Sequence, residues 1–197
     1  MKYRIAKGAF AVEVIECIST RRSIRSYTDE EIPNTVIEEL LRLGTKAATG
    51  SNQQPWGFVV IKDKGEIEKL SAEIRDFLIE NFEKYPYFQQ YEKMFQHPKF
   101  DVLNRSNCVI LMYGNTKSHW AVYDTSLAAG NIMLAAHAQG IGSCWIGFAE
   151  PICNTKEFKA KYNVSEEFDL VCTLTIGYTK KSLEPSVRKD PLIFHFA

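Results

Sequence analysis

Hydrophobic and polar positions follow two periods along this chain, and the two periods predict helices and strands in turn. Apolar residues at helical spacing predict helices over 12–18, 36–48, 66–85, 121–139 and 155–162. Short apolar runs rich in β-branched residues predict strands over 56–61, 108–113, 143–148 and 170–176. Helical segments alternate with strands that look buried, and they outweigh them. This pattern indicates an α/β or α+β fold in three layers.

Length and composition are those of one globular domain. A chain of 197 residues with 45% hydrophobic positions buries roughly 70% of its unfolded surface, so it needs no disulfide or metal to fold. We find no linker or repeat and expect a single domain over 1–197. One segment, 82–105, is unusually aromatic. It predicts either a lid-like wall over a flat ligand or a satellite of the hydrophobic core.

Charge and cysteine usage exclude several classes of function. The formal net charge is zero, with 24 Lys and Arg against 24 Asp and Glu, so bulk charge does not favour nucleic-acid binding. The five cysteines have neither metal-ligand nor disulfide spacing. Glu13 and Glu16 interrupt the apolar run of a signal peptide, and no run approaches the ~18 residues of a membrane span. We expect a cytoplasmic protein with no metal.

Three segments contain candidate ligand-binding chemistry. Arg21, Arg22 and Arg25 surround Ser23 at a predicted helix end. Guanidinium groups match phosphate oxygens bidentately, although a basic helix end also interacts favourably with the helix dipole without any ligand.

The second segment runs through Asn52 and Gln54 to a strand. Paired side-chain amides suit the pyrimidine edge of a flavin, which alternates carbonyls with an N–H, and the same residues are also common in turns.

The third segment, 131–147, joins a small-residue helix to a strand bracketed by Gly140, Gly142 and Gly147. Glycines let a ligand approach the backbone closely, and they also cap helices before buried strands. The small helix faces predict close packing, either in the core or across a dimer.

Together, the segments 21–25, 52–56 and 131–147 resemble the nitroreductase family in their order and separation. Ile176–Tyr178 and Arg188 fit the same pattern. The resemblance implies an α+β fold, a three-layer α-β-α sandwich, that forms a homodimer. It further implies FMN at each subunit interface, held by both chains, with NAD(P)H as co-substrate.

The resemblance assigns cofactor contacts to Arg21, Arg22, Ser23, Arg25, Thr49, Asn52, Gln54, Trp145, Ile146, Gly147 and Arg188. The arginines and Ser23 would bind the phosphate and the N1/O2 side of the ring. The residues from 49 to 54 would reach in from the partner subunit, and the backbone of 145–147 would line the ring near N5. No catalytic side chain is implied, because the flavin N5 carries the chemistry.

The chain departs from the family pattern in places. Ala48 and Gly50 stand where members often carry Pro and Ser, and Ser186 stands where some have a second basic residue. Asn81 and Lys84 match loosely an Asn and a Lys that some members place on the flavin. The 82–105 segment corresponds to the variable excursion over the pocket, so the resemblance does not identify the substrate.

Three functional hypotheses follow. The first is an FMN oxidoreductase that transfers hydride by a ping-pong scheme from NAD(P)H to a nitroaromatic, quinone or similar flat acceptor. The second is a flavin-binding module, such as a sensor, a store or a flavin-remodelling relative, without nicotinamide-driven turnover. The third is a thiol hydrolase built on Cys144, for which the sequence offers no neighbouring base.

Overall fold

The computed structural model describes residues 13–179, 184 and 186–196; the N-terminal part of the predicted domain, 1–12, lies outside it. The longer helices are α1 (Val14–Thr20), α2 (Asn34–Gly44), α3 (Lys64–Glu80), α6 (Ala121–Ala138) and α8 (Lys156–Lys161). Shorter helices are η1 (Gly50–Asn52), α4 (Pro86–Gln89), α5 (Glu92–Phe95) and α7 (Glu150–Cys153). The strands are β1 (Trp56–Ile61), β2 (Cys108–Asn115), β3 (Ile141–Ile146) and β4 (Phe168–Tyr178).

The strands form one sheet in the order β1-β2-β4-β3, and neighbouring strands are antiparallel. The two central strands, β2 and β4, are buried over most of their length. Their register shifts between Met112 and Tyr113, where an irregularity bends the ladder. In the order given above, β1 and β3 form the two edges of the sheet. The outer edge of β3 is part of the candidate site described below.

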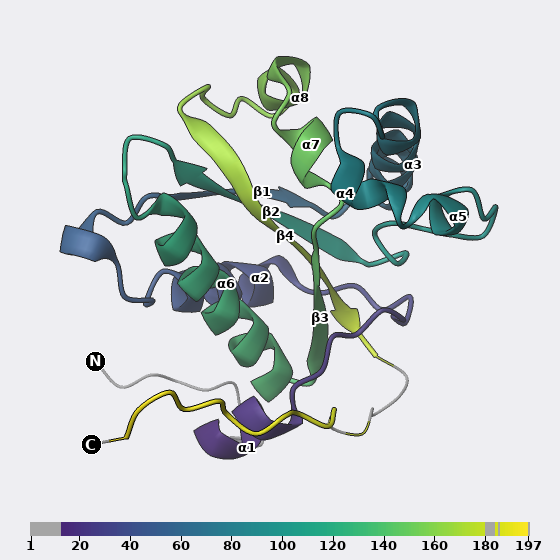
Figure 1. Cartoon of the computed structure of the whole chain (residues 1–197). Coiled ribbons are helices and arrows are strands. Elements are labelled where there is room, and N and C mark those ends of the chain that lie inside the picture. Colours follow the sequence, from purple (N-terminus) through teal and green to yellow (C-terminus); the bar gives the residue numbers. More distant parts are fainter. Residues whose placement is uncertain (1–12, 180–183, 185, 197) are drawn as a thin grey trace.

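The sheet separates two hydrophobic cores, because successive side chains of a strand point to opposite faces. On β2, Val109, Leu111 and Tyr113 pack with α3, α5, α7 and α8. Ile110 and Met112 pack with α2 and α6. Figure 1 shows the resulting layers, with the sheet between the two groups of helices. The predicted three-layer α+β architecture is confirmed.

The helix pair α2 and α6 packs closely because one residue lacks a side chain. A Cβ at Gly44 would lie 2.7 Å from Cγ1 of Ile132. Ala128, Ala129 and Ala136 add further small buried positions on α6. The small-residue faces predicted from the sequence therefore serve the core here, while other positions of α6 remain exposed.

The aromatic segment 82–105 folds into the short helices α4 and α5 and joins the core. Phe95 is buried, and its ring lies 5.0 Å from that of Phe148, centroid to centroid. The rings of Tyr91 and Phe88 meet the same Phe148 ring at 5.2 and 5.8 Å. The segment is thus anchored directly after the end of β3.

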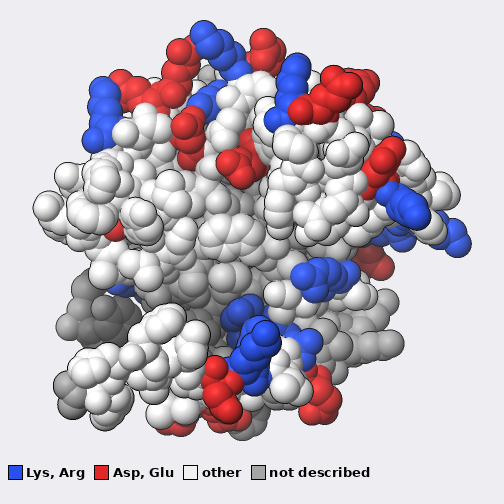
Figure 2. All heavy atoms as spheres, viewed as in Figure 1, with Lys and Arg blue, Asp and Glu red and all other residues white. Residues whose placement is uncertain are grey.

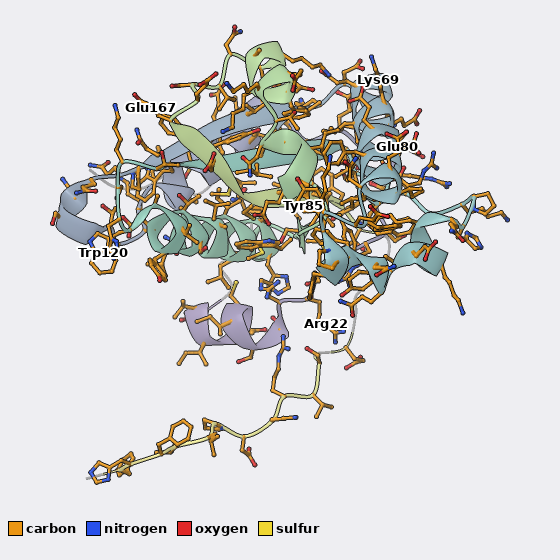
Figure 3. All side chains as sticks on the ribbon, turned by 45° about the horizontal axis from the view of Figure 1, so that its top comes forward. Arg22, Lys69, Glu80, Tyr85, Trp120 and Glu167 are labelled. Carbon is orange, nitrogen blue, oxygen red and sulfur yellow. The ribbon has the colours of Figure 1, made fainter. Side chains whose placement is uncertain are left out.

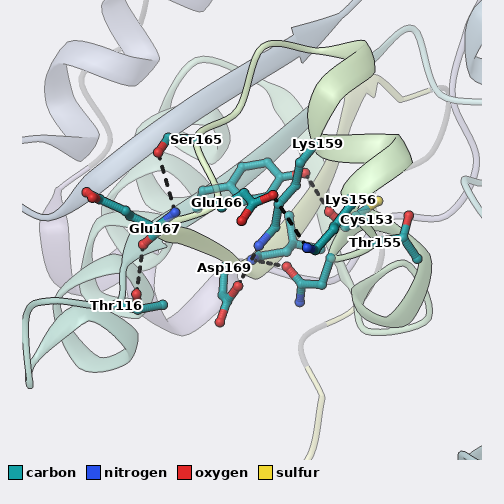
Figure 4. A network of polar contacts seen from close by, with 12 residues as sticks. Thr116, Cys153, Thr155, Lys156, Lys159, Ser165, Glu166, Glu167 and Asp169 are labelled. Carbon is teal, nitrogen blue, oxygen red and sulfur yellow. Dashed lines mark hydrogen bonds and ion pairs between the residues drawn. The ribbon is translucent and has the colours of Figure 1, made fainter.

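Polar contacts fix α7 and α8 on β4, as Figure 4 shows. The Lys159 ammonium is buried and lies 2.7 Å from the Asp169 carboxylate. The side-chain oxygen of Asn154 accepts a 2.7 Å hydrogen bond from the N–H of Leu170. Tyr113 donates to the carbonyl oxygen of Cys153 at 3.1 Å. These contacts lie away from the three candidate segments.

The described C-terminal residues follow β4 and cross in front of α1 in the view of Figure 1. Val187, Leu192, Phe194 and Phe196 in this arm are all exposed. Among the helices of the described residues, we find none with the length and apolar character of a membrane-spanning segment.

Candidate functional site

The arginine-rich segment lies along the outer edge of β3. The N–H of Ile24 donates to the carbonyl oxygen of Ser143 at 2.9 Å, and Ser23 and Ser143 form an isolated parallel bridge. The approach depends on Gly142, since a Cβ there would lie 2.8 Å from Cβ of Ile24. Two of the three segments predicted from the sequence are therefore brought together within one protomer.

Arg21 ends α1, with its N–H donating to the carbonyl oxygen of Cys17 at 3.1 Å. Its guanidinium nitrogen Nη1 is buried and has no hydrogen-bond partner among the described residues. Burying such a group without a partner is costly, and buried charges normally pair with an opposite charge. Arg21 is therefore suited to hold an anion, such as a phosphate group.

The other arginines of the segment differ in their surroundings. Arg22 donates from Nη1 to the carbonyl oxygen of Glu184, which ties the C-terminal arm to the segment. Arg25 is exposed. Burial raises the pKa of the neighbouring Cys144 thiol, and the positive charges of Arg25 and Arg21 lower it in part. The segment is thus strongly electropositive beside β3.

The free edge of β3 provides main-chain donors next to this charge. The Ser143 carbonyl faces the outer edge, so strand alternation turns the N–H of Trp145 to the same edge, and Gly147 follows directly after the strand. The Trp145 side chain is 38% exposed, whereas Ile146 is buried. A Cβ at Gly147 would meet no atom within 4 Å. The end of β3 can accept a flat ligand against its backbone.

The third predicted segment, around η1, lies elsewhere. Gly50 packs under Trp120, where a Cβ would lie 2.3 Å from Cδ1 of the indole ring. This close contact explains why the chain departs from the family's serine at this position. The Gly50 N–H donates to both carboxylate oxygens of Asp124, at 3.1 and 3.3 Å. The segment is therefore attached to the first turn of α6.

The backbone around η1 is strained. Ser51, Asn52 and Gln54 have φ values of 52°, 54° and 49°. Each left-handed non-glycine residue costs of the order of 1–3 kcal/mol and persists only where the surroundings hold it. The Thr49 hydroxyl helps, since it accepts a hydrogen bond from the N–H of Gln54 at 3.0 Å. The exposed side chains of Asn52 and Gln54 are thereby fixed in place.

The two groups of predicted residues occupy opposite ends of α6. Thr20, next to Arg21, lies 2.9 Å from His137 at the C-terminal end, while Gly50 contacts Asp124 at the N-terminal end. The helical rise separates positions 124 and 137 by about 20 Å. In Figure 3 the labelled Trp120 and Arg22 lie apart from each other, toward different ends of α6. One protomer does not bring both groups to one ligand.

Three further predicted residues are Arg188, Asn81 and Lys84. Arg188 is exposed in the C-terminal arm. Asn81 follows α3, where its side chain donates to the carbonyl oxygen of Phe77 at 2.8 Å. Lys84 donates to the Asn81 side-chain oxygen at 3.0 Å. These two side chains satisfy each other within the protomer.

The structure weakens the thiol hydrolase hypothesis. Cys144 is buried, and burial raises the pKa of its thiol, so little of the nucleophilic thiolate forms near neutral pH. Asp124, by contrast, was missed by the sequence analysis. An acidic residue in the first turn of a helix is common because of the helix dipole. The signal in the sequence is that Asp124 is the only acidic residue of α6, and the structure shows it buried.

Comparison with known proteins now gives a family. The family model described as "Nitroreductase family" matches residues 18–178. A protein of Archaeoglobus fulgidus, named provisionally as an NADH dehydrogenase/NAD(P)H nitroreductase, is 29% identical over 174 residues, which cover 85% of this chain and 86% of that protein. The iodotyrosine deiodinase of Thermotoga neapolitana is 25% identical, over 80% of this chain and 84% of its own length.

Solved structures agree on the fold. A nitroreductase of Bacteroides fragilis with bound FMN superposes with a TM-score of 0.82 at 24% identity, covering 94% of this chain and 100% of that one. At this identity the likeness concerns the arrangement of helices and strands.

Proposed function

This chain belongs to the nitroreductase family, and on that premise we propose that it is an FMN-dependent oxidoreductase. It would transfer hydride in a ping-pong scheme from NAD(P)H to a nitroaromatic, quinone or similar flat acceptor. One observation carries the proposal. Nη1 of the half-buried Arg21 is itself buried and has no hydrogen-bond partner in the described part of the chain, and Arg21 lies on the segment that runs beside the open end of β3, so an anion site and free main-chain donors meet at one place.

The residues present fit FMN. Arg21, Arg22, Ser23, Arg25 and Arg188 would hold the phosphate and the N1/O2 side of the ring through charge-assisted hydrogen bonds. The N–H of Trp145 at the outer edge of β3 and that of Gly147 directly after the strand would face the ring near N5. FMN, when bound, supplies the redox chemistry itself. No general base from the protein is then needed.

The homodimer is part of the proposal, because each protomer holds two half-sites at opposite ends of α6. Thr49, Asn52 and Gln54 of one protomer would complete the site that begins at Arg21 of the other. The surface supports this pairing. Val122, Tyr123 and Leu127 are exposed on α6, and Val14, Ile15 and Ile18 on α1. Figure 2 shows few charges over the N-terminal half of α6. Large exposed apolar patches mark interaction surfaces.

A single domain over 1–197 and a wall formed by 82–105 also belong to the proposal. The aromatic segment packs on Phe148, one residue after Gly147, and Tyr87 in it is 68% exposed. The exposed Tyr87 ring thus belongs to a segment that packs beside the end of the proposed flavin site. A cytoplasmic location fits the five cysteines, all free and buried.

A second acceptor class has specific support. A relative that matches most of this chain is named an iodotyrosine deiodinase. A halogenated phenol is therefore the alternative acceptor, and the aromatic surroundings of Phe148 suit either class.

The test begins with the purified protein. We expect the visible absorbance of bound flavin, which bleaches when NADH or NADPH is added without oxygen. Re-oxidation by a nitroaromatic, a quinone or 3-iodotyrosine then identifies the acceptor class. Bound flavin that does not bleach over minutes would favour the flavin-binding module instead. A protein that neither retains nor takes up FMN would overturn the assignment.

A further inference from the structure

We propose that Asp124 is a positioning residue for the cofactor site of the partner subunit. It would act by holding the η1 loop, residues 49–54, in the conformation that reaches across the dimer. The inference rests on the proposed function, since it needs both the dimer and the cofactor. It goes further by assigning a role to a residue that neither the sequence patterns nor the resemblance identified.

The first observation is the carboxylate itself. Asp124 is 5% exposed, and both of its oxygens are directed at the Gly50 N–H. Among the described residues, no other group donates a hydrogen bond to this carboxylate. Burying a carboxylate that has a single main-chain donor costs free energy. A functional role for the contact would explain why the chain keeps it. The contact fixes one particular peptide group of the η1 loop.

The second observation concerns the part of the loop next to this attachment. Trp120, the N-cap residue of α6, covers Gly50, and the left-handed residues follow Gly50 immediately along the chain. Gln54 donates from its side-chain nitrogen to the Asn52 side-chain oxygen at 3.1 Å. This leaves the Asn52 amide donors and the Gln54 carbonyl for a group outside the loop. A donor beside an acceptor complements an N–H beside a carbonyl, as in the imide edge of a flavin.

The third observation is the position of Asp124 on α6. Its neighbours Tyr123 and Leu127 are exposed and belong to the surface proposed to contact the second copy, while Asp124 points inward to the loop. One turn of helix therefore carries both the contact surface and the support of the loop. Asp124, which holds the loop, and His137, which contacts Thr20 beside Arg21, are about 20 Å apart along α6. The side chains of the loop therefore serve the other subunit's site.

The experiment compares D124A, D124N and the control S126A by equilibrium titration with FMN. The Ser126 hydroxyl bonds only within its own helix, to the carbonyl of Val122, so S126A should bind like the wild type. D124A should remain dimeric and bind FMN about tenfold or more weakly. D124N keeps one acceptor oxygen, so its affinity for FMN should lie between those of the wild type and D124A. Wild-type affinity in both Asp124 variants would overturn the inference, while the wild type still binding FMN would leave the proposed function standing.

A mixed dimer tests whether Asp124 acts across the interface. One protomer carries R21A and the other carries whichever Asp124 variant remains dimeric, and two tags isolate the heterodimer. If Asp124 serves the partner, both defects fall in one site and the other site is intact, so each heterodimer binds one FMN at wild-type affinity. If Asp124 serves its own subunit, both sites are damaged and no tight site remains. The second result would overturn the inference, and the first also shows that the variant protomer folds.

Discussion

The main-chain N–H of Ile24 bonds to the carbonyl oxygen of Ser143, and this contact seats the arginine segment on the edge of β3. The contact is possible only because Gly142 has no side chain. The position of the arginine segment relative to the main-chain donors of β3 thus depends on this one backbone contact. Changes near the contact should therefore affect the site even when every arginine is retained.

Adding a methyl group at Gly142 should displace the arginine segment. Its Cβ would lie 2.8 Å from Ile24, and such overpacking costs about 1–3 kcal/mol of unfolding free energy. We expect G142A to unfold at lower urea concentration and to bind FMN more weakly. The control is G57A on β1, where the new Cβ would lie 3.4 Å from the Phe168 ring, an ordinary contact. Equal behaviour of the two variants would contradict the close-approach argument.

Removing the Arg21 guanidinium should release the cofactor. A charge-assisted contact contributes about 1.5–3 kcal/mol, so R21A should weaken FMN binding roughly 10- to 150-fold and yield largely colourless protein. R75A removes an arginine of comparable size that pairs with Asp76 on the surface and should keep its colour. The flavin-to-protein absorbance ratio measures both. Full occupancy in R21A would count against the site.

A charge on the exposed face of α6 should separate the dimer. L127D places a carboxylate at a position that is 52% exposed in the protomer, and such a change at an interface centre costs about 2 kcal/mol or more. Sedimentation should show monomers, with flavin lost in parallel. I79D changes an aliphatic residue on α3 that is also exposed and should stay dimeric. A dimeric L127D with full flavin would place the interface elsewhere.

His137 should make stability fall in mild acid. Burial lowers its pKa from 6.5, and the Arg21 charge lowers it further. The unfolded chain then binds more protons than the folded one, so the unfolding free energy decreases as pH falls below about 6.5 until the folded pKa is passed. Above that range the contribution vanishes. In urea unfolding between pH 7.5 and 5, the curves of wild type and H137Q should run parallel at the upper end, and the wild type should lose stability more steeply toward pH 5. Curves that stay parallel down to pH 5 would show that another group is responsible.

The layers of the fold follow from patterns that the sequence displays. β1 occupies 56–61 as predicted, because an apolar, β-branched run begins directly after Pro55. The two-sided burial of β2 follows from a run without polar interruptions. α3 ends at Glu80 rather than near 85, since Asn81 donates back to Phe77, and that local capping outweighs the apolar pattern beyond it. The aromatic segment has no clear period, so α4 and α5 were not foreseen.

The site was less accessible to sequence reasoning, and the reason is distance along the chain. No local pattern links Ile24 with Ser143, and only the family resemblance predicts that the segments 21–25 and 131–147 meet. The turn before β1 was indicated by Gly50 and Asn52, but the left-handed conformations of Ser51 and Gln54 were not. They depend on Trp120 and Asp124, which lie on a helix far along the sequence.

The length of α6 has a consequence for the protein at low concentration. If each site takes half of its contacts from either end of this helix in two subunits, a dissociated protomer retains only half of the ligand contacts. Dilution should then strip the cofactor together with the partner, and saturating FMN should hold the pair together by mass action. The FMN concentration would then set the lowest protein concentration at which the dimer remains assembled and active.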